Sequence, residues 1–116
     1  MEKKIIQLIK AREFLAITAF KNSLPEIKGE YDFLFPSKGV ENSNILLIKN
    51  VTEEFMNAFH SLVNNKTISF APCNFWEVTH DGGEVYDLPI VKGKKSSYKK
   101  LHWLPLMIKK GEKFPE

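Results

Sequence analysis

Four apolar residues stand consecutively at Ile45–Ile48, and the structure that they form decides which fold this chain of 116 residues can adopt. As a helix, residues 44–49 would open a helix-turn-helix with a second helix over residues 52–63, which resembles a winged helix in the order of its elements. As a strand, they would open a β-α-β-β unit with the N-terminal helix packed across a small sheet. The β-branched Ile at both ends favours a strand, and the spacing to Asn50 favours the helix-turn-helix. Both alternatives stay open, and both predict a small α+β domain.

Two helices are predicted on either side of this run. Residues 2–21 carry apolar side chains at steps of three and four, with Asn22, Ser23 and Pro25 ending the pattern. Residues 52–63 have a full apolar face, and Asn64 and Asn65 follow as its end. Asn50 is the expected cap of this second helix, with Glu53 as the return arm of a capping box.

A β-hairpin is predicted after the second helix. Residues 75–79 and 84–88 flank His80-Asp81-Gly82-Gly83, and Asp-Gly between alternating segments is a strong short-range signal for a hairpin. Alternation also predicts short strands around Tyr31–Phe35 and Thr67–Phe70. Residues 101–108 are expected to return to the core with Trp103 as the anchor, because a large aromatic side chain beside Leu, Pro and Met usually packs.

Length and composition predict one domain over residues 1–116. The chain has a single cysteine, Cys73, which excludes an internal disulfide and favours a reducing, cytoplasmic location. No apolar segment approaches the length of about 18 residues that a membrane span needs, so no membrane partner is expected.

The strongest functional signal is a run of positive charge near the C-terminus. Residues 92–110 contain seven lysines and no acid, whereas residues 1–91 contain nine basic residues and twelve acids. Lysines neutralise phosphates without reading bases, and aromatic side chains among them can stack on unpaired bases. The predicted nucleic-acid-binding residues lie in and beside the basic segment 92–100: Lys92, Lys94, Lys95, Tyr98, Lys99, Lys100 and His102. A simpler interpretation is that the same lysines lie on a solvent-exposed connecting segment and bind nothing.

Patterns for catalysis and metal binding are weak. His60, His80 and His102 are about twenty residues apart, and the chain has neither HxxxH nor CxxC spacing for a metal. A lone cysteine such as Cys73 is more often a small buried residue than a metal ligand or a nucleophile. No catalytic residue, metal site or cofactor is therefore predicted, and an enzyme is the less favoured class.

Two functions follow from these observations. The first is a small nucleic-acid-binding protein, such as a transcriptional regulator, that contacts the phosphate backbone through residues 92–100 and through the tip of the hairpin at 80–83. The single arginine argues against bidentate reading of guanine, so binding should depend on the backbone and on salt. The alternative is a protein-interaction module or homodimeric adaptor that uses an aromatic surface formed by Phe33, Phe35, Phe75 and Trp76.

Overall fold

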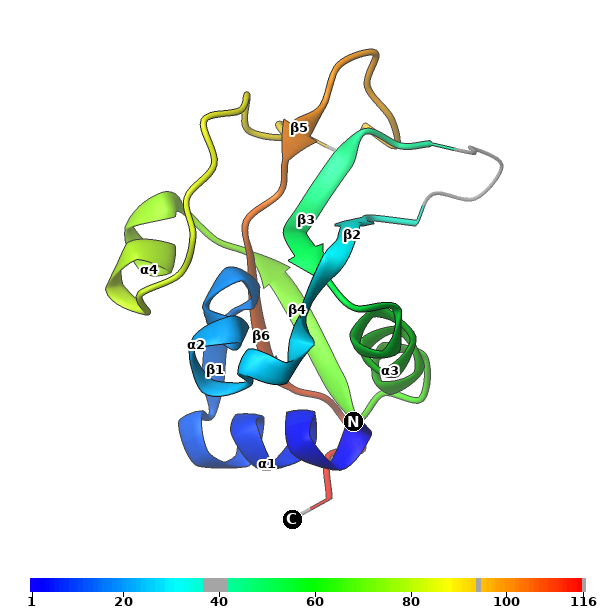
Figure 1. Cartoon of the computed structure of the whole chain (residues 1–116), viewed down its shortest axis with the longest axis vertical. Coiled ribbons are helices and arrows are strands. Elements are labelled where there is room, and N and C mark those ends of the chain that lie inside the picture. The colour runs from blue at the N-terminus through cyan, green and yellow to red at the C-terminus, as the bar shows by residue number, and fades with distance from the viewer. Residues whose placement is uncertain (37–41, 94, 116) are drawn as a thin grey trace.

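The computed structural model describes residues 1–36, 42–93 and 95–115, which form an α+β domain with two small sheets. The elements in chain order are α1 (Glu2–Arg12), β1 (Phe14–Ala16), η1 (Ile17–Ala19), α2 (Phe20–Ser23), η2 (Pro25–Ile27), β2 (Lys28–Leu34), β3 (Ile45–Val51), α3 (Glu53–Asn64), β4 (Ile68–Pro72), α4 (Phe75–His80), β5 (His102–Trp103) and β6 (Leu106–Lys110). In Figure 1, α1 lies at one end, α3 and α4 flank the sheets on opposite sides, and β5 lies at the other end. The predicted α+β class is confirmed.

The four apolar residues at 45–48 form a strand. They belong to β3, the central strand of a sheet with the order β2-β3-β5, in which β2 is antiparallel and β5 parallel to it. All four side chains are buried, because both faces of this strand are covered. A strand here removes the first helix of a helix-turn-helix, so the winged-helix alternative is wrong and the β-α-β order is the one observed.

The helix predicted over residues 52–63 is confirmed as α3, but its cap lies two positions after the predicted Asn50. Thr52 is the N-cap, and its side chain accepts a hydrogen bond of 3.1 Å from the backbone N–H of Phe55. Asn50 instead belongs to β3 and has a φ of 58°, a left-handed conformation that Asn tolerates better than most residues. The apolar face of α3 buries Phe55, Ala58, Phe59 and Leu62.

The predicted N-terminal helix is shorter than its apolar pattern. Glu13 adopts a φ of 68° and ends α1, while its backbone N–H still donates to the carbonyl of Ile9. The chain then enters β1, the edge of the second sheet, which has the antiparallel order β1-β6-β4. Leu15 and Ala16, which continue the helical pattern in sequence, are buried as strand residues. Periodicity alone did not reveal this change of element.

The hairpin predicted over residues 75–88 is wrong, because its first segment is the helix α4. Asn74 caps this helix through a capping box with Glu77, in which each side chain bonds the other residue's backbone N–H. Gly82 follows with a φ of 78°. Gly83 packs so closely on Thr18 that a Cβ would lie 2.6 Å from the threonine hydroxyl. The 80–83 segment is therefore a helix end that docks on the body of the protein, and it is no exposed hairpin tip.

One apolar core joins the two sheets and the helices. Four phenylalanine rings meet edge to face inside it, with Phe55 contacting Phe20 and Phe33, and Phe59 contacting Phe33. Trp103 is 1% exposed, which confirms that the C-terminal segment returns to the core. Pro105 separates β5 from β6. Within the described residues, no helix has the length and apolar character needed to cross a membrane.

Candidate nucleic-acid interface

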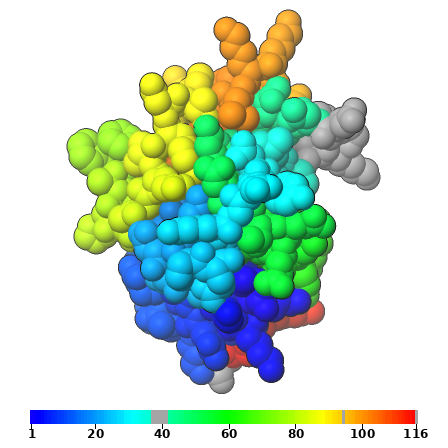
Figure 2. All heavy atoms as spheres, viewed as in Figure 1, coloured from blue at the N-terminus to red at the C-terminus, as the bar shows by residue number. Residues whose placement is uncertain are grey.

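The basic loop, which we define as residues 92–100, leads into β5 at one end of the molecule (Figure 1). Figure 2 shows the orange part of the chain, to which this loop belongs, projecting beyond the rest of the surface. Lys92, Lys95, Lys99 and Lys100 are exposed, and Lys94 lies outside the described residues. The predicted lysines that can be placed are therefore together on one projecting loop.

Tyr98 holds the basic loop in place. Its backbone N–H donates to the carbonyl of Ser43 at 2.9 Å, and its own carbonyl accepts from Nδ2 of Asn44 at 2.8 Å. Its hydroxyl accepts from the backbone N–H of Lys92 at 3.2 Å and donates to the carbonyl of the same residue at 3.1 Å. These bonds tie both ends of the loop to each other and to the start of β3.

The Tyr98 ring has two close neighbours. The ring of His102 is stacked on it, with centroids 3.8 Å apart and 20° between the planes. The ammonium group of Lys95 lies over the Tyr98 ring at 4.9 Å from the centroid. Tyr98 therefore supports the loop from within.

His102 is fixed by its backbone and by its ring. Its backbone N–H donates to the carbonyl of Asn44 at 2.8 Å. Its Nδ1 lies 2.8 Å from the carbonyl of Lys100, and because a carbonyl only accepts, this nitrogen carries the hydrogen. The ring nitrogen Nε2 is left to accept a hydrogen bond from outside.

Among the described residues, no ion pair neutralises the charge of the basic loop. No carboxylate among the described residues pairs with Lys92, Lys95, Lys99 or Lys100, although three other lysines form ion pairs, with Glu26, Glu84 and Glu112. A recess of about 390 Å³ opens beside the loop, lined by Pro89, Ile90, Lys92, Lys95, Tyr98 and His102. Exposed ammonium groups around a shallow recess can bind the oxygen atoms of a phosphate.

The remaining lysines of the run lie elsewhere. In β6, Leu106 is paired with Pro72, whereas Lys109 and Lys110 are paired with Ser69 and Ile68 at the other end of β4. Figure 1 shows β6 leading from the neighbourhood of β5 toward the C-terminus at the opposite end of the molecule. The described lysines of the positive segment are thus divided between two ends of the molecule, with those of the basic loop at one end and Lys109 and Lys110 at the other.

The surroundings of Cys73 do not activate its thiol. Partial burial, with Glu77 and Asp81 nearby, raises the pKa of the Cys73 thiol to about 11, so the thiol is protonated at neutral pH. Oδ2 of Asp81 accepts from the backbone N–H of Ala16 at 2.8 Å, a structural bond between α4 and β1. Across the residues that the structure describes, no three side chains of the metal-binding types come together.

The aromatic surface expected for a protein partner is smaller than the sequence indicated. Phe33 is buried and Phe35 is half-buried, so neither presents a fully exposed ring. Phe75 and Trp76 on α4 are 46% and 70% exposed, and their rings contact each other with centroids 4.7 Å apart. These two side chains form the exposed aromatic pair of α4.

Sequence reasoning missed Ser43 and Asn44, the residues that anchor the basic loop. Asn44 has a φ of 56°, and its amide reaches the carbonyls of both Tyr98 and Lys99. The only local signal was an Asn-Ser-Asn sequence before β3, which is typical of turns in general.

Comparison with known proteins gives no further guide to identity: no family model, no curated protein and no solved structure matches this chain.

Proposed function

We propose that this protein binds nucleic acid through its phosphate backbone, using the basic loop. The observation that carries the proposal is a set of four exposed lysines that have no carboxylate partner among the described residues and lie on a projecting loop held by Tyr98: Lys92, Lys95, Lys99 and Lys100. A preformed loop loses less conformational entropy on binding than a flexible tail does. Lysine presents a point charge and lacks the planar, bidentate guanidinium group of arginine. The lysine contacts should therefore be to phosphates and not to the edges of bases.

A salt titration tests this proposal. Each phosphate contact releases condensed counterions, so the slope of log affinity against log salt should be reduced by about three to four units when the four lysines become glutamine. Fluorescence anisotropy with a labelled oligonucleotide measures both the affinity and the slope. The proposal fails if no binding occurs at low salt, or if the four-lysine variant keeps the affinity and the slope of the parent protein.

A matched control variant carries the same change in charge at the opposite end of the molecule from the basic loop. Lys3, Lys10, Lys109 and Lys113 are exposed and lie on or near α1 and the C-terminal end of β6. Their replacement by glutamine removes four positive charges without touching the basic loop. If net charge alone attracted the nucleic acid, this control would weaken binding as much as the loop variant. We expect it to keep most of the affinity.

A second candidate function is protein recognition by the exposed aromatic pair of α4. The capping box holds this helix, and Val78 anchors it in the core, so the exposure of Phe75 and Trp76 does not come from a frayed end. Exposed tryptophan is a frequent centre of binding energy in interfaces. Analytical ultracentrifugation of the parent protein and of Trp76→Ser tests whether the pair joins two copies. A monomer at all concentrations would exclude the homodimeric form of this candidate.

A further inference from the structure

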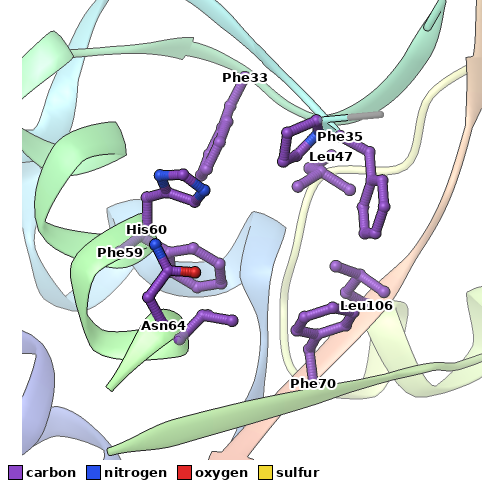
Figure 3. Close-up of a pocket in the computed structure, with 10 residues that line it drawn as sticks. Phe33, Phe35, Leu47, Phe59, His60, Asn64, Phe70 and Leu106 are labelled. Atoms are coloured by element: carbon purple, nitrogen blue, oxygen red, sulfur yellow. The ribbon is translucent and has the colours of Figure 1, made fainter. Parts of the chain in front are cut away.

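A small pocket with aromatic walls lies between α3 and the two sheets. Its volume is about 200 Å³, and its apolar lining includes Phe33, Phe35, Leu47, Phe59, Phe70 and Leu106. The rings of Phe33 and Phe59 meet edge to face, as do those of Phe35 and Phe70. Figure 3 shows these side chains around a common space. The volume is below the range of roughly 300–1,000 Å³ typical for drug-sized ligands, so the pocket suits one small ring system.

Two polar side chains stand at the rim of this pocket. His60 and Asn64 lie on successive turns of α3 and are exposed. In Figure 3 both lie on the α3 side of the pocket, across the space from Phe70 and Leu106. Neither side chain bonds to another described residue. Each offers a donor and an acceptor, so together they match a ring with a mixed hydrogen-bonding edge better than a purely anionic group.

Some of the residues that line the aromatic pocket also lie next to the basic loop. Phe35, Phe70 and Leu106 line a second, adjoining hollow of about 530 Å³, whose other residues include Gly93, Lys95 and Ser96. A ligand with a ring in the aromatic pocket and a phosphate beside Lys95 would therefore lie along one stretch of surface.

We propose that the aromatic pocket binds one unstacked nucleobase while the basic loop binds the phosphates of the same strand. This inference rests on the proposed function and narrows its substrate to single-stranded nucleic acid. A base inside a duplex has its faces stacked and its pairing edge occupied, so it cannot enter the pocket, whereas an unpaired base can be turned out of the strand. The aromatic side chains of the pocket then contact the base, and His60 and Asn64 form hydrogen bonds with the edge of the base.

Fluorescence anisotropy at fixed salt tests this preference. The probes are a labelled single strand of about 12 nucleotides, within the usual site size of such proteins, and a hairpin duplex of related sequence. Asn64→Ala and His60→Ala should each weaken binding of the single strand, and the double variant should weaken it about fivefold or more. Duplex affinity should not change. Both residues are exposed on α3, so the variants should fold.

Asn57→Ala is the matched control. Asn57 is on the same helix and equally exposed, but it lies beside Met1 and Glu2, away from the aromatic pocket. The control should bind the single strand as the parent protein does. Equal weakening by Asn57→Ala and Asn64→Ala would overturn the inference, because it would show a general effect on α3.

Titrations followed by NMR distinguish a base within a strand from a free nucleotide. Amide shifts of His60, Val63 and Asn64 on adding nucleoside 5′-monophosphates would show that a free nucleotide suffices. The same shifts with the oligonucleotide alone would show that the strand is needed. Inorganic phosphate should shift only the basic loop. The inference is overturned if neither nucleotide nor oligonucleotide shifts the pocket residues.

The two proposals fail in different ways. Loss of binding in the four-lysine variant, with no effect of His60→Ala or Asn64→Ala, would overturn the pocket inference and leave the phosphate contacts standing. Absence of binding to any oligonucleotide at low salt would overturn both.

Discussion

The ring of Tyr98 lies almost parallel to the ring of His102, 3.8 Å away, while its hydroxyl exchanges two hydrogen bonds with the backbone of Lys92. One side chain thus connects the two ends of the basic loop with β5. The order of this loop, and through it the placement of the lysines, depends on Tyr98.

Replacing Tyr98 should therefore loosen the loop without unfolding the protein. Tyr98→Phe keeps the ring contact and removes the two bonds to Lys92, worth about 1 kcal/mol together because the site is partly exposed. Tyr98→Ala removes both kinds of contact. Heteronuclear NOE values of residues 95–100 should fall slightly in the first variant and strongly in the second. Tyr31→Ala, at an exposed position of β2, is the control and should leave them unchanged.

The cap of α3 gives a second prediction. Thr52→Ala removes the acceptor of the Phe55 N–H and should lower the free energy of unfolding by about 1 kcal/mol. Asn50→Gly should be close to neutral, because the φ of 58° suits glycine and the side chain is no cap. Urea unfolding of both variants measures the difference. A larger loss for Asn50→Gly than for Thr52→Ala would contradict the assignment of the cap.

Sequence patterns predicted the elements whose signals are local. The apolar face of residues 52–63 specified α3, and the strands around Phe33 and Phe70 followed from alternation. The hairpin failed because two local signals compete after Pro72. Asp81-Gly82 favours a turn between strands, but Asn74 and Glu77 form a capping box that starts a helix first. The spacing of Asn74 and Glu77 is itself a local signal for the start of a helix, and in the structure it prevails over the turn signal.

The candidate site was predictable only in part. An unopposed run of lysines predicts exposure, and the exposure is observed at Lys92, Lys95, Lys99 and Lys100. The hydrogen bonds that hold the basic loop could not be predicted from the sequence, because Asn44 and Tyr98 are 54 residues apart. The aromatic pocket likewise combines residues of β2, β3, α3, β4 and β6, which come together only when the two sheets and α3 pack.

A polar network around Tyr86 gives a third prediction. The hydroxyl of Tyr86 accepts from the backbone N–H of Lys49 at 2.9 Å and donates to Oε1 of Glu84 at 2.8 Å. The buried ammonium of Lys21 donates to the same carboxylate and to the carbonyl of Lys49. Tyr86→Phe leaves the Lys49 N–H without its acceptor.

Tyr86→Phe should therefore destabilise the protein by about 1–2 kcal/mol, the usual cost of an unsatisfied, largely buried backbone group. Burial and the bond to Glu84 also raise the pKa of Tyr86 well above its ordinary value, so its hydroxyl stays protonated through moderately alkaline pH. Chemical unfolding measures the loss of stability, with Tyr31→Phe as the exposed control. Equal stability of the two variants would show that the network contributes nothing.

Cys73 gives a prediction for alkaline pH. Burial raises the pKa of its thiol from an ordinary value near 9 to about 11, so the native state holds the proton that the unfolded chain releases. This contribution to stability is complete below about pH 9 and is lost as the pH rises toward 11. Alkylation by iodoacetamide at neutral pH should be slower than for free cysteine, since only the thiolate reacts. Cys73→Ala should unfold with a flatter dependence on pH between 9 and 11 than the parent protein. Rapid alkylation at neutral pH in the folded protein, with the rate of a free thiol, would contradict the protonated state assigned to Cys73.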